Sequence, residues 1–139
     1  MTRTVRAIMG VFSFSWLTRF VDYITGEDYQ AGFIQVDNLY TPIVWAYACL
    51  CMFALFLFAA VTGWYKAGIY AGLFGNAVFL MLASQIYQVS MLPWPWPPEN
   101  PRLVVNDLVD AAVCLILAVS IWYRNQVAAE KVLLKEKRE

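Results

Sequence analysis

Three long apolar stretches limit what this chain can fold into. They run from about Ile43 to Trp64, from Gly68 to Leu92 and from Leu103 to Tyr123, and only the third contains charges, Asp107 and Asp110. Each reaches the roughly 20 residues that a helix needs to cross about 30 Å of hydrocarbon. Because lipid offers no hydrogen bonds to the backbone, each stretch is predicted to be a transmembrane helix. The predicted fold class is an all-α integral membrane protein.

The composition agrees with a membrane environment. Apolar residues make up 61% of the 139 residues and charged residues 14%, against roughly 45–50% and about 25% in soluble domains. We expect one membrane domain over 1–139, with an N-terminal helix over 1–25, a membrane core over 43–123 and a charged tail over 124–139. The lipid bilayer of a cell (inner or plasma) membrane is the expected partner. Zero net charge argues against nucleic-acid binding.

Groups that carry catalysis are scarce. The chain has no histidine, which removes the commonest general base and the usual haem, copper and catalytic zinc ligands. Its three cysteines, Cys49, Cys51 and Cys114, form no CxxC pattern and are interpreted as small apolar fillers. We therefore expect no enzyme activity, no cofactor and no metal.

Two connections between the apolar stretches are distinctive. The first consists only of residues 65–67 and predicts a tight antiparallel hairpin. The second, residues 93–101, contains five prolines in nine residues, which forbid a helix and favour a stiff extended strap. Tryptophan and tyrosine gather at the ends of the stretches, as they do at membrane–water interfaces.

The first 25 residues are ambiguous. Only 12 uncharged residues separate Arg6 from Arg19, too few to span a bilayer. One helical face would gather large apolar side chains: Val5, Ile8, Met9, Phe12, Trp16 and Phe20. We favour an amphipathic helix lying in the headgroup plane. The alternative is a fourth span, from about Ala7 to Ile24, in which Arg19 pairs with Asp22.

Basic residues predict the orientation. Six of them lie on one side of the predicted spans: Lys66, Arg124, Lys131, Lys135, Lys137 and Arg138. The positive-inside rule therefore puts the C-terminus in the cytoplasm. Three spans would leave the N-terminus outside and four would bring it inside, so charge does not decide the status of the first helix. The tail is expected to continue the third apolar helix out of the membrane.

Two stripes of small residues predict close helix packing. Gly68, Gly72 and Gly75 lie on the second stretch, and Ala111, Cys114 and Ala118 follow Asp107 at helical spacing on the third. Small residues let helix backbones approach each other in lipid. We expect the glycine stripe to pack closely against the first stretch or against another copy, and the stripe on the third stretch to face protein rather than lipid.

Polar side chains at matching depths predict a cluster. Gln85 and Gln88 precede the end of the second stretch by seven and four residues, and Asp110 and Asp107 follow the start of the third by the same numbers. At about 1.5 Å per residue, these pairs lie at equal depth, with Tyr47 at the same level. The cluster is interpreted as a hydrogen-bonded clasp between helices, or alternatively as a proton or cation site.

Three functions fit these features. The first is a structural or accessory subunit of a membrane assembly, with other membrane subunits as partners. The second is a self-associating pore or lesion former. In size and three-span topology with a charged cytoplasmic tail, the chain is similar to one class of phage holins, which implies a homo-oligomer. The third is a small ion or proton channel or transporter subunit that uses the Asp/Gln cluster.

Overall fold

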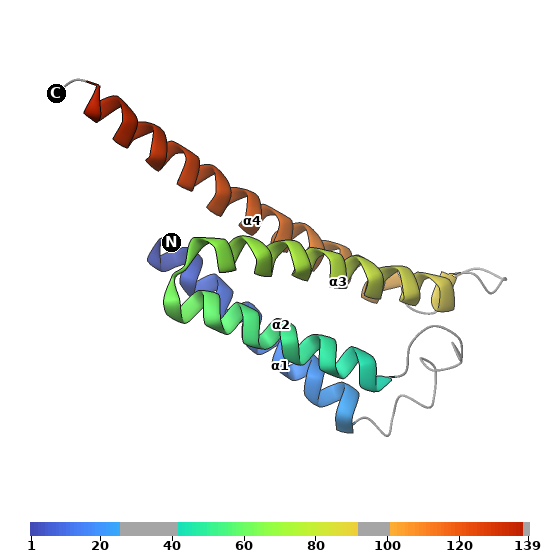
Figure 1. Cartoon of the computed structure of the whole chain (residues 1–139). Helices are drawn as coiled ribbons and strands as arrows, with labels where there is room; N and C mark the ends of the chain where they lie inside the picture. The colour runs from blue at the N-terminus through green and yellow to red at the C-terminus, as the bar shows by residue number, and fades with distance from the viewer. Residues whose placement is uncertain (26–41, 92–100, 138–139) are drawn as a thin grey trace.

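The part of the chain that the structure describes is a bundle of four α-helices (Figure 1). The computed structural model describes residues 1–25, 42–91 and 101–137, and its helices are α1 (Arg3–Thr25), α2 (Pro42–Thr62), α3 (Tyr65–Met91) and α4 (Pro101–Glu136). Three of them, α2, α3 and α4, are long and apolar enough to cross a membrane. The predicted fold class is therefore confirmed.

The turn between α2 and α3 is shorter and earlier than predicted. Only Gly63 and Trp64 separate the two helices, whereas residues 65–67 belong to α3. Gly63 has a φ of 67°, a left-handed conformation that ends helices and that glycine adopts without a steric penalty. The prediction missed this helix end because the apolar pattern runs on through Trp64. Of the predicted proline strap, 93–100 lies outside the described residues, and Pro101 is the first residue of α4.

The helices form two antiparallel pairs, α1 with α2 and α3 with α4 (Figure 1). Arg6, near the start of α1, contacts the end of α2. Along the other pair, Gly68 of α3 meets Ile121 of α4, while Gly75 meets Cys114. A smaller contact between α2 and α3 helps to join the pairs.

Large side chains from three helices fill the centre of the bundle. Trp16 of α1, Phe56 of α2 and Phe79 of α3 are fully buried. The Trp16 ring lies 4.3 Å from the Phe79 ring and 6.4 Å from the Phe56 ring, measured between centroids. Burial of such aromatic side chains contributes roughly 1.5–3 kcal/mol each in water; in lipid, packing and dispersion replace most of this term. The first helix is thus part of the core.

This position of α1 differs from that of a helix lying free at the membrane surface. Most of the apolar face predicted from the sequence packs on protein: Val5, Met9 and Trp16 are buried, and Phe12 and Phe20 are partly buried against the core, whereas Ile8 is exposed. The opposite side is mixed, since Val11 and Phe14 are exposed beside Thr4, Thr18 and Asp22. Apolar side chains on both sides are typical of a helix inside a membrane bundle.

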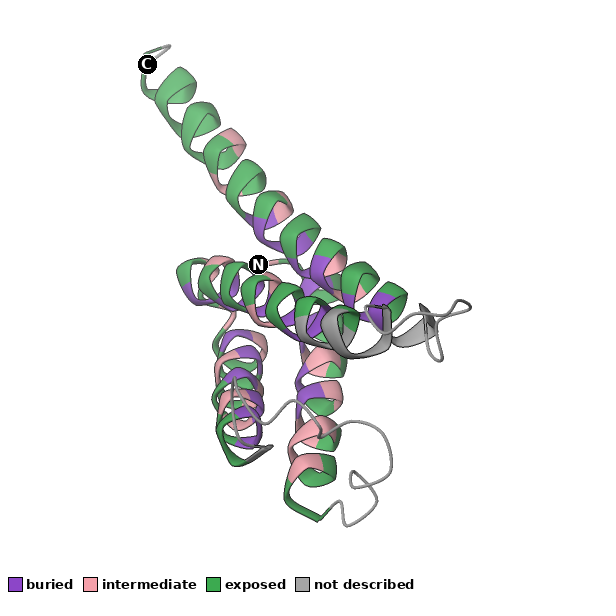
Figure 2. Cartoon of the chain, turned by 90° about the vertical axis from the view of Figure 1, so that its right-hand side faces the viewer, coloured by how far each residue is buried: buried purple, intermediate pink, exposed green. Residues whose placement is uncertain are grey.

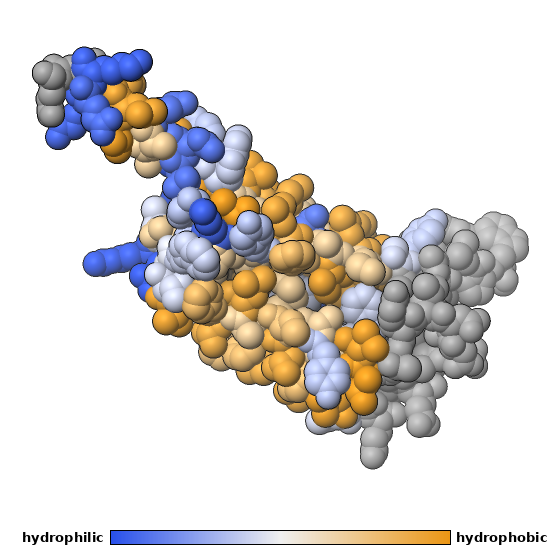
Figure 3. Space-filling view, viewed as in Figure 1, coloured by the Kyte–Doolittle hydropathy of each residue, from blue (hydrophilic) through white to orange (hydrophobic). Residues whose placement is uncertain are grey.

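The outer surface of the bundle is largely apolar (Figure 3). Exposed apolar side chains lie on every helix, among them Val44, Phe58, Leu73, Phe74, Leu80, Val109, Ile116 and Val119. Soluble monomers rarely expose contiguous apolar patches larger than a few hundred Å². The surface fits a small membrane protein, with lipid in place of water around the bundle.

Helix α4 extends well beyond the other helices (Figures 1 and 2). Its 36 residues give a length of about 54 Å, and residues 128–137 are all exposed. The expectation that the charged tail continues the third apolar helix is confirmed.

Candidate functional site

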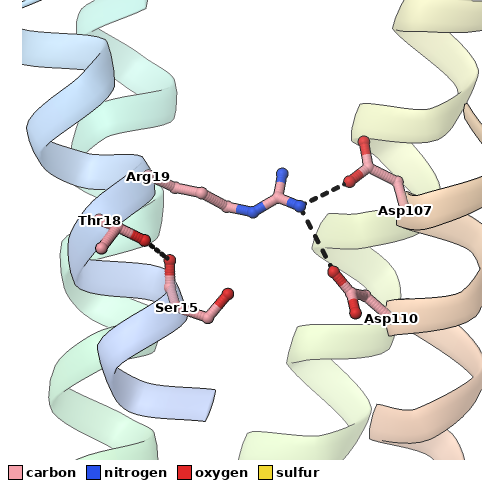
Figure 4. Close-up of polar contacts among 5 residues, drawn as sticks. All are labelled: Ser15, Thr18, Arg19, Asp107 and Asp110. Carbon is pink, nitrogen blue, oxygen red and sulfur yellow. Dashed lines mark hydrogen bonds and ion pairs between the residues drawn. The ribbon is translucent and has the colours of Figure 1, made fainter. Parts of the chain in front are cut away.

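A charged cluster joins α1 to α4 inside the bundle (Figure 4). The Arg19 Nη2 atom donates to Asp107 Oδ1 at 2.8 Å and to Asp110 Oδ2 at 3.4 Å. The two carboxylates lie three residues apart on α4, so they share one helix face and both reach toward the same guanidinium. We call Arg19, Asp107 and Asp110 the ionic clasp.

The ionic clasp lies below the level at which the helices end. Arg6 contacts the last turn of α2, and Arg19 is 13 residues further along α1, about 20 Å deeper. The 21 residues of α2 are about 31 Å long, so Arg19 lies roughly 10 Å short of the far end. An unpaired arginine at the membrane centre costs about 2.5–3.5 kcal/mol on insertion scales. Pairing with two carboxylates offsets this cost.

Aromatic rings of α1 and α3 support the arginine. The Arg19 guanidinium carbon lies 4.9 Å from the centroid of the Phe79 ring, whose other neighbour is the Trp16 ring. A cation over a desolvated aromatic face gains up to about 2 kcal/mol. Phe79 therefore holds Arg19 between α3 and the two carboxylates, and the site joins α1, α3 and α4.

The ionic clasp retains unused hydrogen-bonding capacity. Two carboxylates and one guanidinium give it a formal charge of −1. The Asp107 side chain is 3% exposed, and within the described residues its Oδ2 atom has no hydrogen-bond partner. The same holds for the Trp16 indole N–H. A buried polar atom without a partner costs about 1–3 kcal/mol, so this site could accept a proton or a small polar ligand.

A second arginine fixes the other end of α1. The Arg6 Nε atom donates to the Ala60 carbonyl oxygen at 2.6 Å, and its Nη2 atom donates to the Val61 carbonyl oxygen at 2.5 Å. These carbonyls belong to the last turn of α2, where no intrahelical donor is left for them. Arg6 and Arg19 thus attach α1 to the rest of the bundle at two levels.

The structure brings together only part of the predicted polar cluster. Asp107 and Asp110 lie side by side, but Tyr47 is 62% exposed on the outside of α2. Tyr47 does not join the carboxylates because its side of α2 faces away from α4. The side chains of Gln85 and Gln88 lie outside the described part of the structure. Arg19 pairs with the two α4 carboxylates rather than with Asp22, which is exposed on α1.

Sequence reasoning missed the role of Arg19. The signal was present: Arg19 and Asp22 are the charges between Ala7 and Ile24, whereas the third predicted span holds two carboxylates and no cation. Charges inside a membrane pair with one another, so two carboxylates without a local cation predict a contact with an arginine of another segment. The segments are about 90 residues apart, however, and local spacing gave Asp22 as the nearer candidate.

The two predicted stripes of small residues pack against each other. A Cβ atom added to Gly72 would lie 2.6 Å from the Cys114 carbonyl oxygen and 2.8 Å from the Ala118 Cβ. Gly75 is similarly close to the Cys114 Sγ. Next to this contact, the Asn76 Nδ2 atom donates to the Ala111 carbonyl oxygen at 2.9 Å, a hydrogen bond between α3 and α4. The expected partner of the glycine stripe was wrong: the stripe packs mainly on α4, and only Gly75 also meets α2, at Phe56.

None of the three cysteines belongs to the ionic clasp or forms a disulfide. Cys49 and Cys114 are buried, Cys51 is exposed, and all three are free thiols. Among the described residues, no group of three or more Cys, Asp or Glu side chains is arranged to hold a metal ion. The one constellation of charged groups described inside the bundle is thus the ionic clasp.

Comparison with known proteins gives no relative. No protein-family model, curated protein or solved structure matches this chain.

Proposed function

We propose that this chain is a non-catalytic accessory subunit of a membrane assembly. Its four-helix bundle would lie in the bilayer, and the free end of α4 would contact a larger partner on the cytoplasmic side. Three features support the proposal: how the polar groups inside the bundle are used, the extension of α4, and the distribution of charge along the helices.

The polar groups inside the bundle hold its helices together. Arg19 joins α1 to α4, Arg6 joins α1 to α2, and Asn76 joins α3 to α4. Such contacts are what polar side chains in membrane helices usually supply. The glycine stripe, which could have served self-association, is covered by α4. This arrangement favours a rigid structural unit over a pore assembled from many copies.

The extension of α4 is the observation that carries the proposal. Ten consecutive residues, 128–137, are exposed on the part of α4 that extends beyond the bundle. Within it, Val132, Leu133 and Leu134 are 58–59% exposed between charged residues. A helix that bears apolar side chains and leaves its own bundle is suited to lie against a groove of another protein.

Charge is distributed unequally between the two ends of the bundle. Arg3, Arg6, Lys66 and Arg124 lie toward the end with the α2–α3 turn, whereas Asp22 and the ionic clasp lie toward the other end. The positive-inside rule places the basic end in the cytoplasm. In this topology α1 is a fourth membrane helix, and both termini lie on the cytoplasmic side.

Affinity purification from native membranes tests the accessory role. The full chain would carry a C-terminal tag on a flexible linker, be extracted in mild detergent, and be weighed by native mass spectrometry. A matched variant lacking 130–139 removes most of the α4 extension but leaves the bundle intact. We expect a foreign subunit at fixed stoichiometry with the full chain and its loss from the shortened chain.

Two results would contradict the proposal. One is recovery of the chain only as a homo-oligomer, which would favour the pore former. The other is recovery of the same foreign subunit with both variants, which would show that the α4 extension is not the contact.

One observation favours a second candidate, a proton or cation site at the ionic clasp. The Asp107 Oδ2 atom is buried without a partner in the described structure, and the clasp has an excess negative charge. Reconstituted vesicles with a pH-sensitive dye would show proton flux that disappears in Asp107→Asn. Equal leakage from vesicles with the unaltered chain, with Asp107→Asn and without protein would exclude this candidate.

A further inference from the structure

A partly open pocket lies at the basic end of the bundle. It has a volume of about 210 Å³ and is formed by the start of α1, the start of α3 and the part of α4 where the helix leaves the bundle. Polar side chains line one part of it, namely Thr2, Tyr65, Arg124 and Asn125, and apolar Val5, Ile121 and Ala128 line another. Met1 completes the lining, and its N-terminal ammonium donates to the Gly63 carbonyl oxygen at 3.4 Å. The pocket therefore has two chemically different walls.

The position of the pocket corresponds to the membrane surface. Tyr65 follows Trp64 in the α2–α3 turn, and Arg124 follows Trp122 and Tyr123 on α4. Exposed tryptophan and tyrosine side chains lie at the level of lipid headgroups, and Trp64, Trp122 and Tyr123 are all more than half exposed. A pocket beside them faces headgroups on one side and acyl chains on the other.

The charge around the pocket is predominantly positive. Arg124 lines it, and Arg3, Arg6 and Lys66 are each next in sequence to a lining residue. Helices α2 and α3 contain no carboxylate, and on α4 the nearest described one is Glu130, two residues beyond the lining residue Ala128. The Arg124 Nη1 atom donates to the Thr2 hydroxyl at 3.2 Å, which keeps its guanidinium at the pocket.

We propose that this pocket binds the phosphate group of an anionic phospholipid, with Arg124 as the main charged contact. Thr2, Asn125 and Tyr65 would offer neutral hydrogen bonds, and Val5, Ile121 and Ala128 would contact the glycerol and the first acyl carbons. Arginine binds phosphate through bidentate, charge-assisted hydrogen bonds.

The size of the pocket supports a headgroup rather than another ligand. A volume of about 210 Å³ is far larger than the 10–15 Å³ that one water needs. It is smaller than the roughly 300–1,000 Å³ of pockets for drug-sized molecules. A phosphate with its glycerol fits this range, while the acyl chains would remain in the surrounding bilayer. The inference depends on the membrane placement proposed above, but not on the accessory role.

Lipid titration of the purified full chain tests the inference. The protein in neutral detergent would be titrated with dihexanoyl phosphatidylglycerol or with dihexanoyl phosphatidylcholine. Thermal unfolding followed by circular dichroism and lipid retention in native mass spectrometry would both be recorded. We expect selective retention of phosphatidylglycerol and a higher melting temperature with it than with phosphatidylcholine.

Two pairs of variants separate the pocket from general surface charge. Arg124→Gln removes the pocket cation, and Lys131→Gln removes an equally exposed cation from the α4 extension. Ala128→Leu fills the pocket without changing charge, and Ala129→Leu adds the same volume outside it. We expect Arg124→Gln to weaken phosphatidylglycerol binding about fivefold, the value of one cation beside an anionic surface. Ala128→Leu should also weaken phosphatidylglycerol binding, whereas the controls Lys131→Gln and Ala129→Leu should not.

The outcomes are distinguishable. If inorganic phosphate alone raises the melting temperature as much, and Arg124→Gln removes that effect, the site is real and its ligand is free phosphate. Equal binding of the two lipids, or equal effects of Arg124→Gln and Lys131→Gln, would overturn the inference. Either result leaves the capture of a partner subunit, and thus the proposed function, unaffected.

Discussion

Arg19 shows at the scale of one residue how a charge is accommodated in an apolar helix. Its guanidinium contacts two carboxylates and one aromatic face, so each side of the group that meets protein has a favourable partner. The partners are unequal, because Asp107 is 3% exposed and 2.8 Å away while Asp110 is 31% exposed and 3.4 Å away.

This inequality predicts a ranking of variants in the ionic clasp. Asp107→Asn should lower the free energy of unfolding by about 1.5–3 kcal/mol, the value of a hydrogen bond between charged groups. Asp110→Asn should lower it by less, because the 3.4 Å contact between Asp110 and Arg19 is longer and therefore weaker. Unfolding in mixed micelles followed by circular dichroism would measure both, with Asp22→Asn as the exposed control. An equal or larger loss in Asp110→Asn would refute the ranking.

Gly72 gives a second prediction at the residue scale. A methyl group there would lie 2.6 Å from a backbone oxygen of α4, so Gly72→Ala must move the two helices apart. We expect a loss of about 1–3 kcal/mol in unfolding free energy, the usual cost of overpacking.

Gly10 on α1 is the matched control for Gly72. A Cβ atom at Gly10 would meet nothing within 4 Å, so Gly10→Ala should be neutral or should stabilise the helix by up to about 1 kcal/mol. Similar losses in both variants would mean that the α3–α4 contact is looser than the structure shows.

At the scale of elements, α1 is the helix whose role the structure redefines. It is attached to α2 by Arg6 and to α4 by Arg19, and it supplies Trp16 to the core. Three of its hydroxyl groups are hydrogen-bonded within the helix, as a lipid environment requires: Ser13, Thr18 and Thr25 each donate to a carbonyl oxygen of α1 itself. This local bonding is typical of serine and threonine in membrane helices.

The attachment of α1 predicts the topology of the chain. Under the proposed four-span topology, reporters fused separately to the N-terminus and to the C-terminus should both be found in the cytoplasm. A reporter inserted between Glu99 and Asn100 serves as the control for the opposite side. An N-terminal reporter outside the cell would restore the three-span arrangement.

We predict that the extension of α4 is dispensable for folding. Removal of 130–139 deletes only side chains that are exposed wherever the structure describes them, and exposed positions contribute within about 0.5 kcal/mol each. The shortened chain should unfold within about 1 kcal/mol of the full chain in the same micelles. A loss of several kcal/mol would show that the extension packs on the bundle.

At the scale of the whole molecule, the packing of the glycine stripe on α4 argues against the pore former. A lesion former must expose a surface that associates with many copies, but the glycine face of α3 is covered by α4. Overexpression should therefore leave the membrane potential and growth unchanged, as followed with a potential-sensitive dye beside a known lesion former. Abrupt depolarisation on induction would instead favour the holin-like function.

Much of this fold could be predicted from local pattern alone. Apolar length identified α2, α3 and α4, and small residues at helical spacing identified the faces of α3 and α4 that pack on protein, although the glycine stripe was expected against α2 or another copy and packs mainly on α4. The end of α2 was misplaced, because Gly63 stops the helix inside a continuous apolar run. Of the polar cluster, Asp107 and Asp110 were identified by depth, but Tyr47 was included in error because depth does not specify which way a side chain faces.

The sequence by itself determined that the chain is helical and suited to lipid, since hydropathy and length depend only on neighbouring residues. It also determined which residues must avoid lipid, because a charge or a glycine stripe in an apolar helix requires protein beside it. Only the tertiary structure decided that Arg19 meets Asp107 and Asp110 and that α1 belongs to the bundle. Those contacts join segments nearly 90 residues apart, and their energy depends on how four helices are arranged in space.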